Sequence, residues 1–260
     1  MIKLIDIEKD KQKRYKLIYE EKGEKKDCLI HIDMVIKYSL LNQETLDTKT
    51  FKTLMQENQY TETFMHAINL LAKKPYARKG LFKAIKTSTN VPLINQVLDE
   101  LEQLGYLNEQ KTVEYMVNEM MEYDLVGPNF IYTKLEKEGF EESLIKTALT
   151  QYNETKEHEK CHQFLEKTAK TMKTEPVDKM LFKLKTKAYQ KGFNLEVIDR
   201  NLTDLKPKLK ENTDEEELLK KTLQRLKKRY NTQDPKEKNK LIQKLMRDGL
   251  DRKSTRLNSS

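Results

Sequence analysis

Apolar residues recur along most of this chain at the three- and four-residue spacing of one helical face. The clearest stretch is 127–149, in which Ile131 and Leu135 share a face and Gly139 then interrupts the pattern. A glycine at this point can take the left-handed conformation that ends helices, and Phe140 follows as the buried residue after the cap. The stretch therefore predicts two short helices joined at Gly139.

This unit recurs when the chain is aligned on Gly139. The segment 190–202 matches 137–149, segment 86–98 matches it more loosely, and a fourth copy begins at 247–251. The anchors lie 51, 53 and 57 residues apart, at Ser88, Gly139, Gly192 and Gly249. That period fits repeats of three helices. The motif positions are Gly127, Pro128, Ile131, Leu135, Gly139, Phe140, Ile145 and Leu149, then Gly192, Phe193, Ile198 and Leu202.

Two of these glycines are predicted to have a positive φ after a helix, namely Gly139 and Gly192. An alanine at either position is expected to cost about 1 kcal/mol, because its Cβ opposes the left-handed conformation. The prediction is the same for both glycines, since they occupy equivalent positions in the aligned copies.

The first residues of the chain have a different pattern. Residues 2–8 and 14–19 alternate apolar and polar side chains around a charged turn, which predicts a β-hairpin. A third apolar run, 28–32, follows a turn at Gly23. These residues predict a small α+β head.

Aspartates mark the expected starts of three helices. Asp33 is predicted to cap a short helix that continues to Leu40, and Asp47 is predicted to cap a helix that carries Phe51. Asp214 is the candidate cap of the fourth repeat. Each is a residue type whose side chain accepts hydrogen bonds from the free N–H groups of a first helical turn.

The predicted fold is mainly α: an elongated tandem array of three-helix repeats behind the α+β head. Pro207 is expected to close the third repeat. The expected segments are the head at 1–58, a degenerate repeat at 59–108, repeats at 109–153 and 154–210, an incomplete fourth repeat at 211–250 and a tail at 251–260.

The tail 251–260 differs from the rest of the chain. It has one apolar residue in ten and resembles the translation of a sequencing adapter, so we expect it to be non-native; the alternative is a natural disordered tail. If it is non-native, the last helix lacks a packing partner. At least one of its apolar residues Leu241, Leu245 and Met246 should then be abnormally exposed.

Composition supports helices and a charged partner. Charged residues make up 35% of the chain, Trp is absent and the formal net charge is +8. The charge is uneven: segment 109–153 has four basic and nine acidic residues, whereas 154–210 has fourteen basic and nine acidic. This layout suits a partner of mixed charge, such as protein on nucleic acid; the alternative is two solvated helix faces.

The basic residues of the later repeats are the candidate binding residues. Only Phe182 and Tyr189 lie among the lysines of 179–191, so the pattern indicates contact with phosphates more than stacking on bases. The residues predicted to face the partner are Lys183, Lys185, Lys187, Lys191, Lys227, Lys228 and Arg229.

The sequence contains no signature of catalysis or of a cofactor site. None of its seven glycines forms a phosphate-binding loop. His158, Cys161 and His162 have the spacing of one helical face, which zinc could use, but no fourth ligand is evident. A core cysteine beside surface histidines is the favoured reading. We therefore expect no metal, no cofactor, no enzyme activity and, without a long apolar run, a cytoplasmic protein without a membrane partner.

On these residues the chain resembles the RecX family, regulators of the RecA recombinase. The resemblance spans about residues 60–250 and rests on the run from Gly127 to Gly139, the pairs Leu144-Ile145 and Ala148-Leu149, and the link 104–108. It implies tandem three-helix repeats in a curved, elongated molecule, long members of the family having a hairpin-containing head. It also implies the absence of catalytic residues.

The activity that the resemblance implies is binding along the groove of the RecA–single-stranded DNA filament. A protein bound there limits strand exchange, ATP hydrolysis and co-protease function. We expect a monomer that contacts the single-stranded DNA indirectly or weakly. The alternatives are a helical protein that binds nucleic acid directly without RecA and a protein-interaction scaffold.

Overall fold

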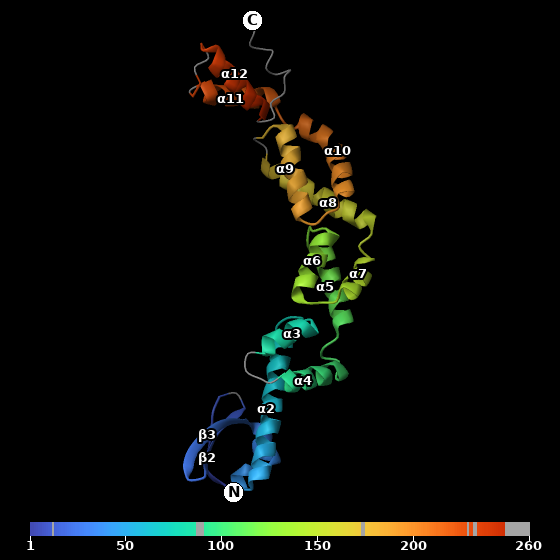
Figure 1. Cartoon of the computed structure of the whole chain (residues 1–260). Coiled ribbons are helices and arrows are strands. Elements are labelled where there is room, and N and C mark those ends of the chain that lie inside the picture. Colours follow the sequence, from blue (N-terminus) through green and yellow to red (C-terminus); the bar gives the residue numbers. More distant parts are fainter. Residues whose placement is uncertain (12, 87–90, 173–174, 228, 231–232, 248–260) are drawn as a thin grey trace. The chain divides into compact units, whose positions relative to one another are not determined.

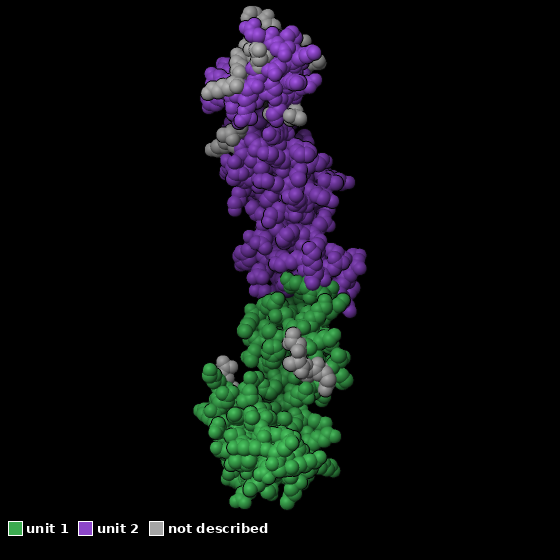
Figure 2. Space-filling model, turned by 60° about the vertical axis from the view of Figure 1, so that its left-hand side comes forward, with its two compact units in different colours: residues 1–112, 138–140 green, residues 113–137, 141–260 purple. Residues whose placement is uncertain are grey.

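The computed structural model describes all residues except 12, 87–90, 173–174, 228, 231–232 and 248–260. The chain forms two compact units, which are residues 1–112 with 138–140 and residues 113–137 with 141–260 (Figure 2). Helices predominate, and a four-stranded antiparallel sheet lies at the N-terminal end of the chain (Figure 1). The predicted fold class, mainly α with a small α+β head, is confirmed.

The sheet confirms the predicted hairpin and adds to it. A tight turn at Lys22 and Gly23, both with positive φ, lets the third strand begin earlier than the apolar run indicates. A short fourth strand, which the sequence pattern does not predict, pairs with the first. The strand order is β3-β2-β1-β4, with β1 at Ile2–Lys9, β2 at Arg14–Glu21, β3 at Glu24–His31 and β4 at Thr45–Leu46.

The predicted cap at Asp33 is wrong. Helix α1 spans Ile32–Lys37 and is capped by His31, whose Nδ1 accepts the Asp33 N–H at 3.3 Å. Strand β3 continues to His31, so the helix begins two residues earlier than expected, and a short 3-10 helix at Leu40–Asn42 follows. The cap at Asp47 is confirmed, because its Oδ1 accepts the N–H groups of residues 49 and 50 at 2.9 Å each.

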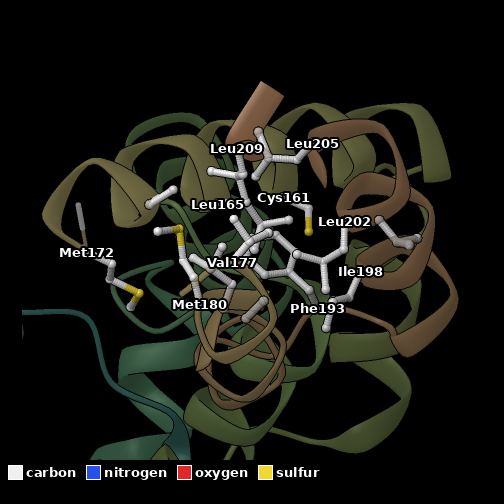
Figure 3. Packing of buried hydrophobic residues seen from close by; sticks show 14 residues of the cluster. Cys161, Leu165, Met172, Val177, Met180, Phe193, Ile198, Leu202, Leu205 and Leu209 are labelled. Carbon is white, nitrogen blue, oxygen red and sulfur yellow. The ribbon is translucent and has the colours of Figure 1, made fainter. Parts of the chain in front are cut away.

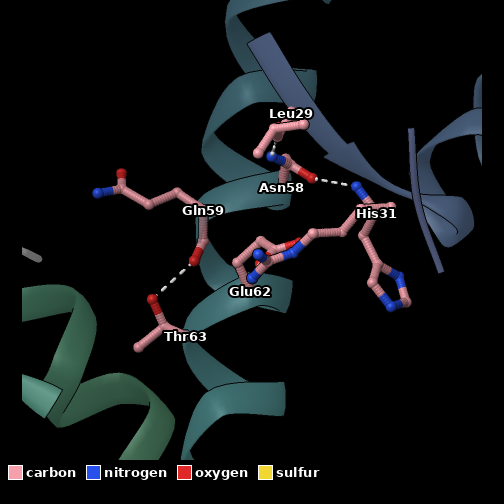
Figure 4. A network of polar contacts seen from close by, with 7 residues as sticks. Leu29, His31, Asn58, Gln59, Glu62 and Thr63 are labelled. Atoms are coloured by element: carbon pink, nitrogen blue, oxygen red, sulfur yellow. Dashed lines mark hydrogen bonds and ion pairs between the residues drawn. The ribbon is translucent and has the colours of Figure 1, made fainter. Parts of the chain in front are cut away.

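Helix α2, Thr48–Leu71, belongs to both the head and the first expected repeat, so the expected boundary at residue 58 falls within it. Asn58 ties this helix to strand β3: its Oδ1 accepts the His31 N–H at 2.8 Å and its Nδ2 donates to the Leu29 carbonyl at 3.0 Å (Figure 4). Both bonds satisfy backbone groups at the end of the sheet. The apolar residues Ile2, Leu17, Ile30 and Leu54 form the head core.

The remainder of the first unit packs against the C-terminal half of α2. Helices α3, Arg78–Ile85, and α4, Val91–Gln103, bury Leu81, Ile94 and Leu98 against Ala67 of α2. The Arg78 guanidinium binds Asp99 at 2.6 Å and Glu102 at 2.8 Å, which joins the start of α3 to α4. The expected copy anchor Ser88 lies outside the described residues.

The second unit begins within the expected repeat 109–153, whose residues 109–112 and 138–140 belong to the first unit. Helices α8, α9 and α10 enclose its largest cluster, which includes Leu165, Leu184, Phe193 and Ile198 (Figure 3). The helices of this part of the chain are α5 at Glu109–Tyr123, α6 at Pro128–Glu138, α7 at Glu142–Leu149, α8 at Glu154–Ala169 with a 3-10 turn at Lys170–Met172, α9 at Val177–Gln190, α10 at Leu195–Glu211, α11 at Glu215–Lys227 and α12 at Pro235–Arg247.

Pro207 does not close the third repeat; it lies inside α10. Proline removes one intrahelical hydrogen bond, yet the helix continues to Glu211 because Leu202, Leu205 and Leu209 keep their face against the cluster on both sides of it. Tertiary burial therefore outweighs the local signal for a helix end.

The last two helices form their own core. Asp214 caps α11 as predicted, its Oδ1 accepting the Glu217 N–H at 2.9 Å. Leu241 and Leu245 of α12 are 5% and 2% exposed because they pack with leucines of α11. Met246, at 42%, is exposed as expected. Gly249 and the tail 251–260 lie outside the described residues.

Cys161 lies at the centre of the α8–α9–α10 cluster and is fully buried. Burial, with a smaller contribution from Glu157, raises the pKa of its thiol to about 12. His162, beside it in sequence, faces Glu166 at 3.5 Å. Across the residues that the structure describes, no group of three histidine, cysteine, aspartate or glutamate side chains is arranged to hold a metal ion.

We expect Cys161 to resist alkylation in the folded protein, because the thiolate is the reacting species and burial keeps the thiol protonated. Iodoacetamide at pH 8 should modify this residue only after denaturation, as peptide mass spectrometry would show. The half-exposed Cys28 provides the internal comparison, its pKa being raised to about 11. Rapid native modification of Cys161 would contradict its placement in the core.

Candidate nucleic-acid interface

Helix α9 carries the densest group of the predicted binding lysines. One face of the helix is buried in the cluster through Met180, Leu184 and Ala188. The lysines lie around the remaining circumference because they fall between these positions in the helical period. Lys187 and Lys191 are exposed, whereas Lys183 and Lys185 are half-buried.

Two of the four lysines are neutralised by carboxylates. Lys183 Nζ lies 2.5 Å from Glu175 Oε1, and Lys185 Nζ lies 2.5 Å from Asp199 Oδ1. Within the described residues, neither Lys187 nor Lys191 makes an ion pair. These two lysines therefore present the charge that an anionic partner would meet first.

The other predicted basic group lies at the end of α11. Lys227 is the last residue of that helix, Lys228 lies outside the described residues, and Arg229 is exposed. Arg229 N–H donates to the Leu226 carbonyl at 2.8 Å, which continues the helical turn. The structure thus describes the α9 group in atomic detail and this group only in part.

A close backbone contact positions the end of α9. The Gly127 N–H donates to the Lys191 carbonyl at 2.8 Å, and the Asn129 N–H donates to the Gly192 carbonyl at 3.1 Å. The backbones approach this closely because Gly127 and Gly192 have no Cβ; an added Cβ on either would overlap backbone atoms of the other segment. Gly192 also has the predicted positive φ, +81°.

Buried polar groups complete this junction. Glu157 is 4% exposed, and its carboxylate accepts the Asn194 N–H at 2.7 Å and the Asn194 Nδ2–H at 2.8 Å. Asn129 Nδ2 donates to Asn194 Oδ1 at 3.0 Å. A carboxylate at this point also opposes the positive end of α10, which begins at Leu195.

A tyrosine joins the loop before α6 to the same region. The Tyr152 hydroxyl donates to the Val126 carbonyl at 2.7 Å, and burial raises the pKa of this phenol above its ordinary value. Lys191 Nζ lies 5.6 Å from the centre of the Phe130 ring. The C-terminal end of α9 is therefore held by backbone, carboxylate and aromatic contacts from α6 and α8.

The remaining motif residues are structural. Gly139 has a φ of +99° after α6, as predicted. Leu149 is half-buried, and the other apolar positions, Ile131, Leu135, Phe140, Ile145, Phe193, Ile198 and Leu202, are buried. Pro128 begins α6 in the position that needs no N–H.

Known proteins with the same organisation are regulatory proteins named RecX. One from Listeria monocytogenes is 22% identical over 247 residues, covering 95% of this chain and 91% of that protein. One from Enterococcus faecalis is 26% identical over 197 residues, covering 75% and 73%. A crystal structure of a regulatory protein RecX superposes with a TM-score of 0.56 at 21% identity, covering 76% of this chain and 98% of that one. These sequence relatives support the predicted family, that of the RecX regulatory proteins. No protein-family model matches this chain.

A second RecX structure, from Lactobacillus salivarius, agrees with the fold at a TM-score of 0.53 and 23% identity, covering 57% of this chain and 97% of that one. The two solved RecX structures thus share the helical fold of this chain. In the described part of this chain, no helix combines the length and apolar character needed to cross a bilayer.

Sequence reasoning undervalued two exposed residues beside the candidate lysines. Phe182 and Tyr189 are 74% and 60% exposed on α9. The signal was present, because both fall out of phase with the buried positions 180, 184 and 188. Large aromatic side chains that are this exposed on the polar face of a helix are candidates for contact with a partner.

Proposed function

We propose that this protein binds the RecA–single-stranded DNA filament and chiefly inhibits its recombinase, ATPase and co-protease activities. It acts in the cytoplasm as a monomer and performs no catalysis of its own. Similarity to RecX regulatory proteins supports a regulatory role. Lys187 of α9 and Lys191, its C-cap, make no ion pair among the described residues, and this is the structural observation that supports contact with an anionic partner.

The charge layout favours a partner that contains protein as well as nucleic acid. Segment 109–153 has a net charge of −5, from four basic and nine acidic residues, whereas 154–210 has +5, from fourteen and nine. A protein that bound only a nucleic-acid backbone would gain from a positive charge in each repeat, because each phosphate contact releases counterions. The acidic repeat is instead suited to a basic protein surface.

The direct test is the rate of ATP hydrolysis by RecA on single-stranded DNA. Addition of this protein below one molecule per RecA should lower the rate, because a bound regulator obstructs the filament. A rate that stays unchanged with the folded, full-length protein would reject the proposal.

Lysine variants test which charges on α9 make the contact. We expect Lys187→Gln with Lys191→Gln to weaken binding to the filament and to flatten its salt dependence by about 0.7 per lost phosphate contact. The matched variant, Lys183→Gln with Lys185→Gln, should have the smaller effect, because carboxylates already neutralise those lysines. Fluorescence anisotropy of filaments across a salt series measures both. Equal salt slopes in the two variants would show that other residues contact the phosphates.

A further inference from the structure

Strand β3 forms one edge of the head sheet, because β2 is its only neighbour in the strand order. Alternate residues of such a strand direct their N–H and C=O groups toward the neighbour, and the others direct theirs outward. Leu29 and His31 belong to the outward set, since the Leu29 carbonyl and the His31 N–H bond to Asn58 of α2 (Figure 4). Lys25 and Asp27 are in phase with these two residues, so their backbone groups also point outward.

The outward groups before Asn58 have no hydrogen-bond partner among the described residues. They are the N–H and C=O of Lys25, the N–H and C=O of Asp27, and the N–H of Leu29. The row is about 13 Å long, because a strand rises about 3.3 Å per residue. Asn58 closes it at one end, since its amide occupies the next groups along the strand. The open edge therefore has the length of about five residues of an added strand.

The opposite edge of the sheet is protected. Strand β4 pairs with the first residues of β1, and the Leu4 N–H donates to the Glu44 carbonyl at 2.8 Å. Beyond this point the register of β1 shifts at a bulge between Leu4 and Asp6, and Asp6 Oδ1 accepts the Ile7 N–H at 2.8 Å. Bulges and covering segments are the means by which natural sheets prevent a further strand from pairing. The edge of β3 has neither along residues 25–29.

The side chains beside the open edge determine what can pair with it. Lys25, Asp27 and Leu29 share the outer face of the sheet, and Leu29 is 46% exposed. Asp27 Oδ2 lies 3.6 Å from Lys16 Nζ on the neighbouring strand, whereas Lys25 makes no ion pair among the described residues. The edge thus offers an apolar side chain and an unpaired cation, four residues apart.

A second copy of this chain matches the edge poorly. Two β3 strands that pair about a two-fold axis at Asp27 place the two Asp27 carboxylates opposite each other, and an axis at Lys26 opposes two lysines. Like charges directly opposite destabilise a strand pair. An axis at Cys28 brings His31 into the pairing, but Asn58 already accepts the His31 N–H. The open edge therefore favours a strand of different sequence.

We propose that β3 accepts an extended segment of a partner protein as a fifth strand of the head sheet. The segment runs antiparallel to β3, which is the more stable pairing and the one used throughout this sheet. It presents an apolar side chain opposite Leu29 and, four residues later, a carboxylate opposite Lys25. Main-chain hydrogen bonds supply the affinity, and these two side chains set the register. The surface belongs to the first unit and does not rest on the regulatory function proposed above.

The test is a titration of the isotope-labelled full-length protein with the peptide acetyl-Thr-Val-Thr-Thr-Thr-Glu-Thr-amide, followed by NMR. Its valine and glutamate meet Leu29 and Lys25 in the proposed register, so the amide resonances of Lys25, Asp27 and Leu29 should shift. Asp27→Pro should weaken binding about tenfold or more, because proline removes an outward N–H and leaves the ladder to β2 complete. The matched control, Asp27→Asn, keeps this N–H and should bind like the wild type. Circular dichroism confirms that each variant is folded.

An exchange of charges tests the register. Lys25→Glu should weaken binding of this peptide about two- to fivefold, the range of one cross-strand charge pair. A peptide with lysine in place of its glutamate should restore the affinity for this variant. The same residues in reversed order should bind the wild type more weakly, because the valine then meets Lys25 and the glutamate meets Leu29.

Three titration results would overturn the proposal. These are β3 amides that do not shift at millimolar peptide, a folded Asp27→Pro variant that binds the peptide normally, and a Lys25→Glu variant whose binding the exchanged peptide does not restore. Sedimentation of the protein alone provides a fourth, since a dimer that Asp27→Pro dissociates would assign the edge to a second copy. These measurements use neither RecA nor DNA, so their failure leaves the regulatory function unaffected.

Discussion

Replacement of Gly192 by alanine is expected to lower the free energy of unfolding of the second unit by about 2–5 kcal/mol. The positive φ of +81° costs about 1–2 kcal/mol in any residue with a Cβ. The new Cβ would also lie 2.6 Å from Phe130 Cβ and 2.7 Å from Phe130 Cα, so the backbones must separate, at about 1–3 kcal/mol. This exceeds the 1 kcal/mol that the sequence alone predicts.

Two other glycines separate the conformational cost from the steric one. Gly139 has a similar φ, +99°, but an added Cβ would lie 3.4 Å from Lys79 Cβ, an ordinary contact, so Gly139→Ala should cost only the conformational part. Gly127 has no left-handed φ, yet its Cβ would overlap the Gly192 carbonyl, so Gly127→Ala should cost only the steric part.

Hydrogen exchange followed by mass spectrometry measures these effects within each unit. Gly192→Ala should accelerate exchange in 126–131 and 188–194 more than Gly127→Ala does. The double variant should cost less than the sum, because both substitutions open the same contact. If Gly192→Ala costs no more than Gly139→Ala, the close approach of Gly127 and Gly192 is refuted.

Glu157→Ala is expected to cost about 3 kcal/mol. The substitution removes the acceptor of two hydrogen bonds and leaves the Asn194 N–H unpaired in a buried site. The control is Glu154→Ala in the same helix, where the carboxylate is 67% exposed and pairs with Arg200; that change should cost less than about 1 kcal/mol. The cost of Glu157→Gln should fall between those of the two alanine variants, since glutamine keeps one acceptor oxygen.

Urea unfolding followed by circular dichroism compares the Glu157 and Glu154 variants. A shift in midpoint with an unchanged slope reports stability alone. Equal midpoints for Glu157→Ala and Glu154→Ala would show that the buried carboxylate does not hold the start of α10.

Much of the fold was predictable because it is encoded locally. Ile131, Leu135 and Ile198 repeat at the helical period, and glycine is the residue that ends a helix with positive φ, so element type and phase follow from sequence. Local signals failed where distant contacts outweigh them. His31 rather than Asp33 caps α1 because the sheet extends to it, and Pro207 remains helical because leucines on both sides are buried.

The candidate interface divides in the same way. The sequence by itself determined that α9 is helical and basic and that Phe182 and Tyr189 lie off its apolar phase, because these properties depend only on spacing along one helix. Only the tertiary structure decided that Lys183 and Lys185 are neutralised, since their partners come from outside the helix. Likewise, only the tertiary structure shows that Gly127 contacts Gly192. A backbone contact between segments 65 residues apart produces no periodic pattern in the sequence of either segment.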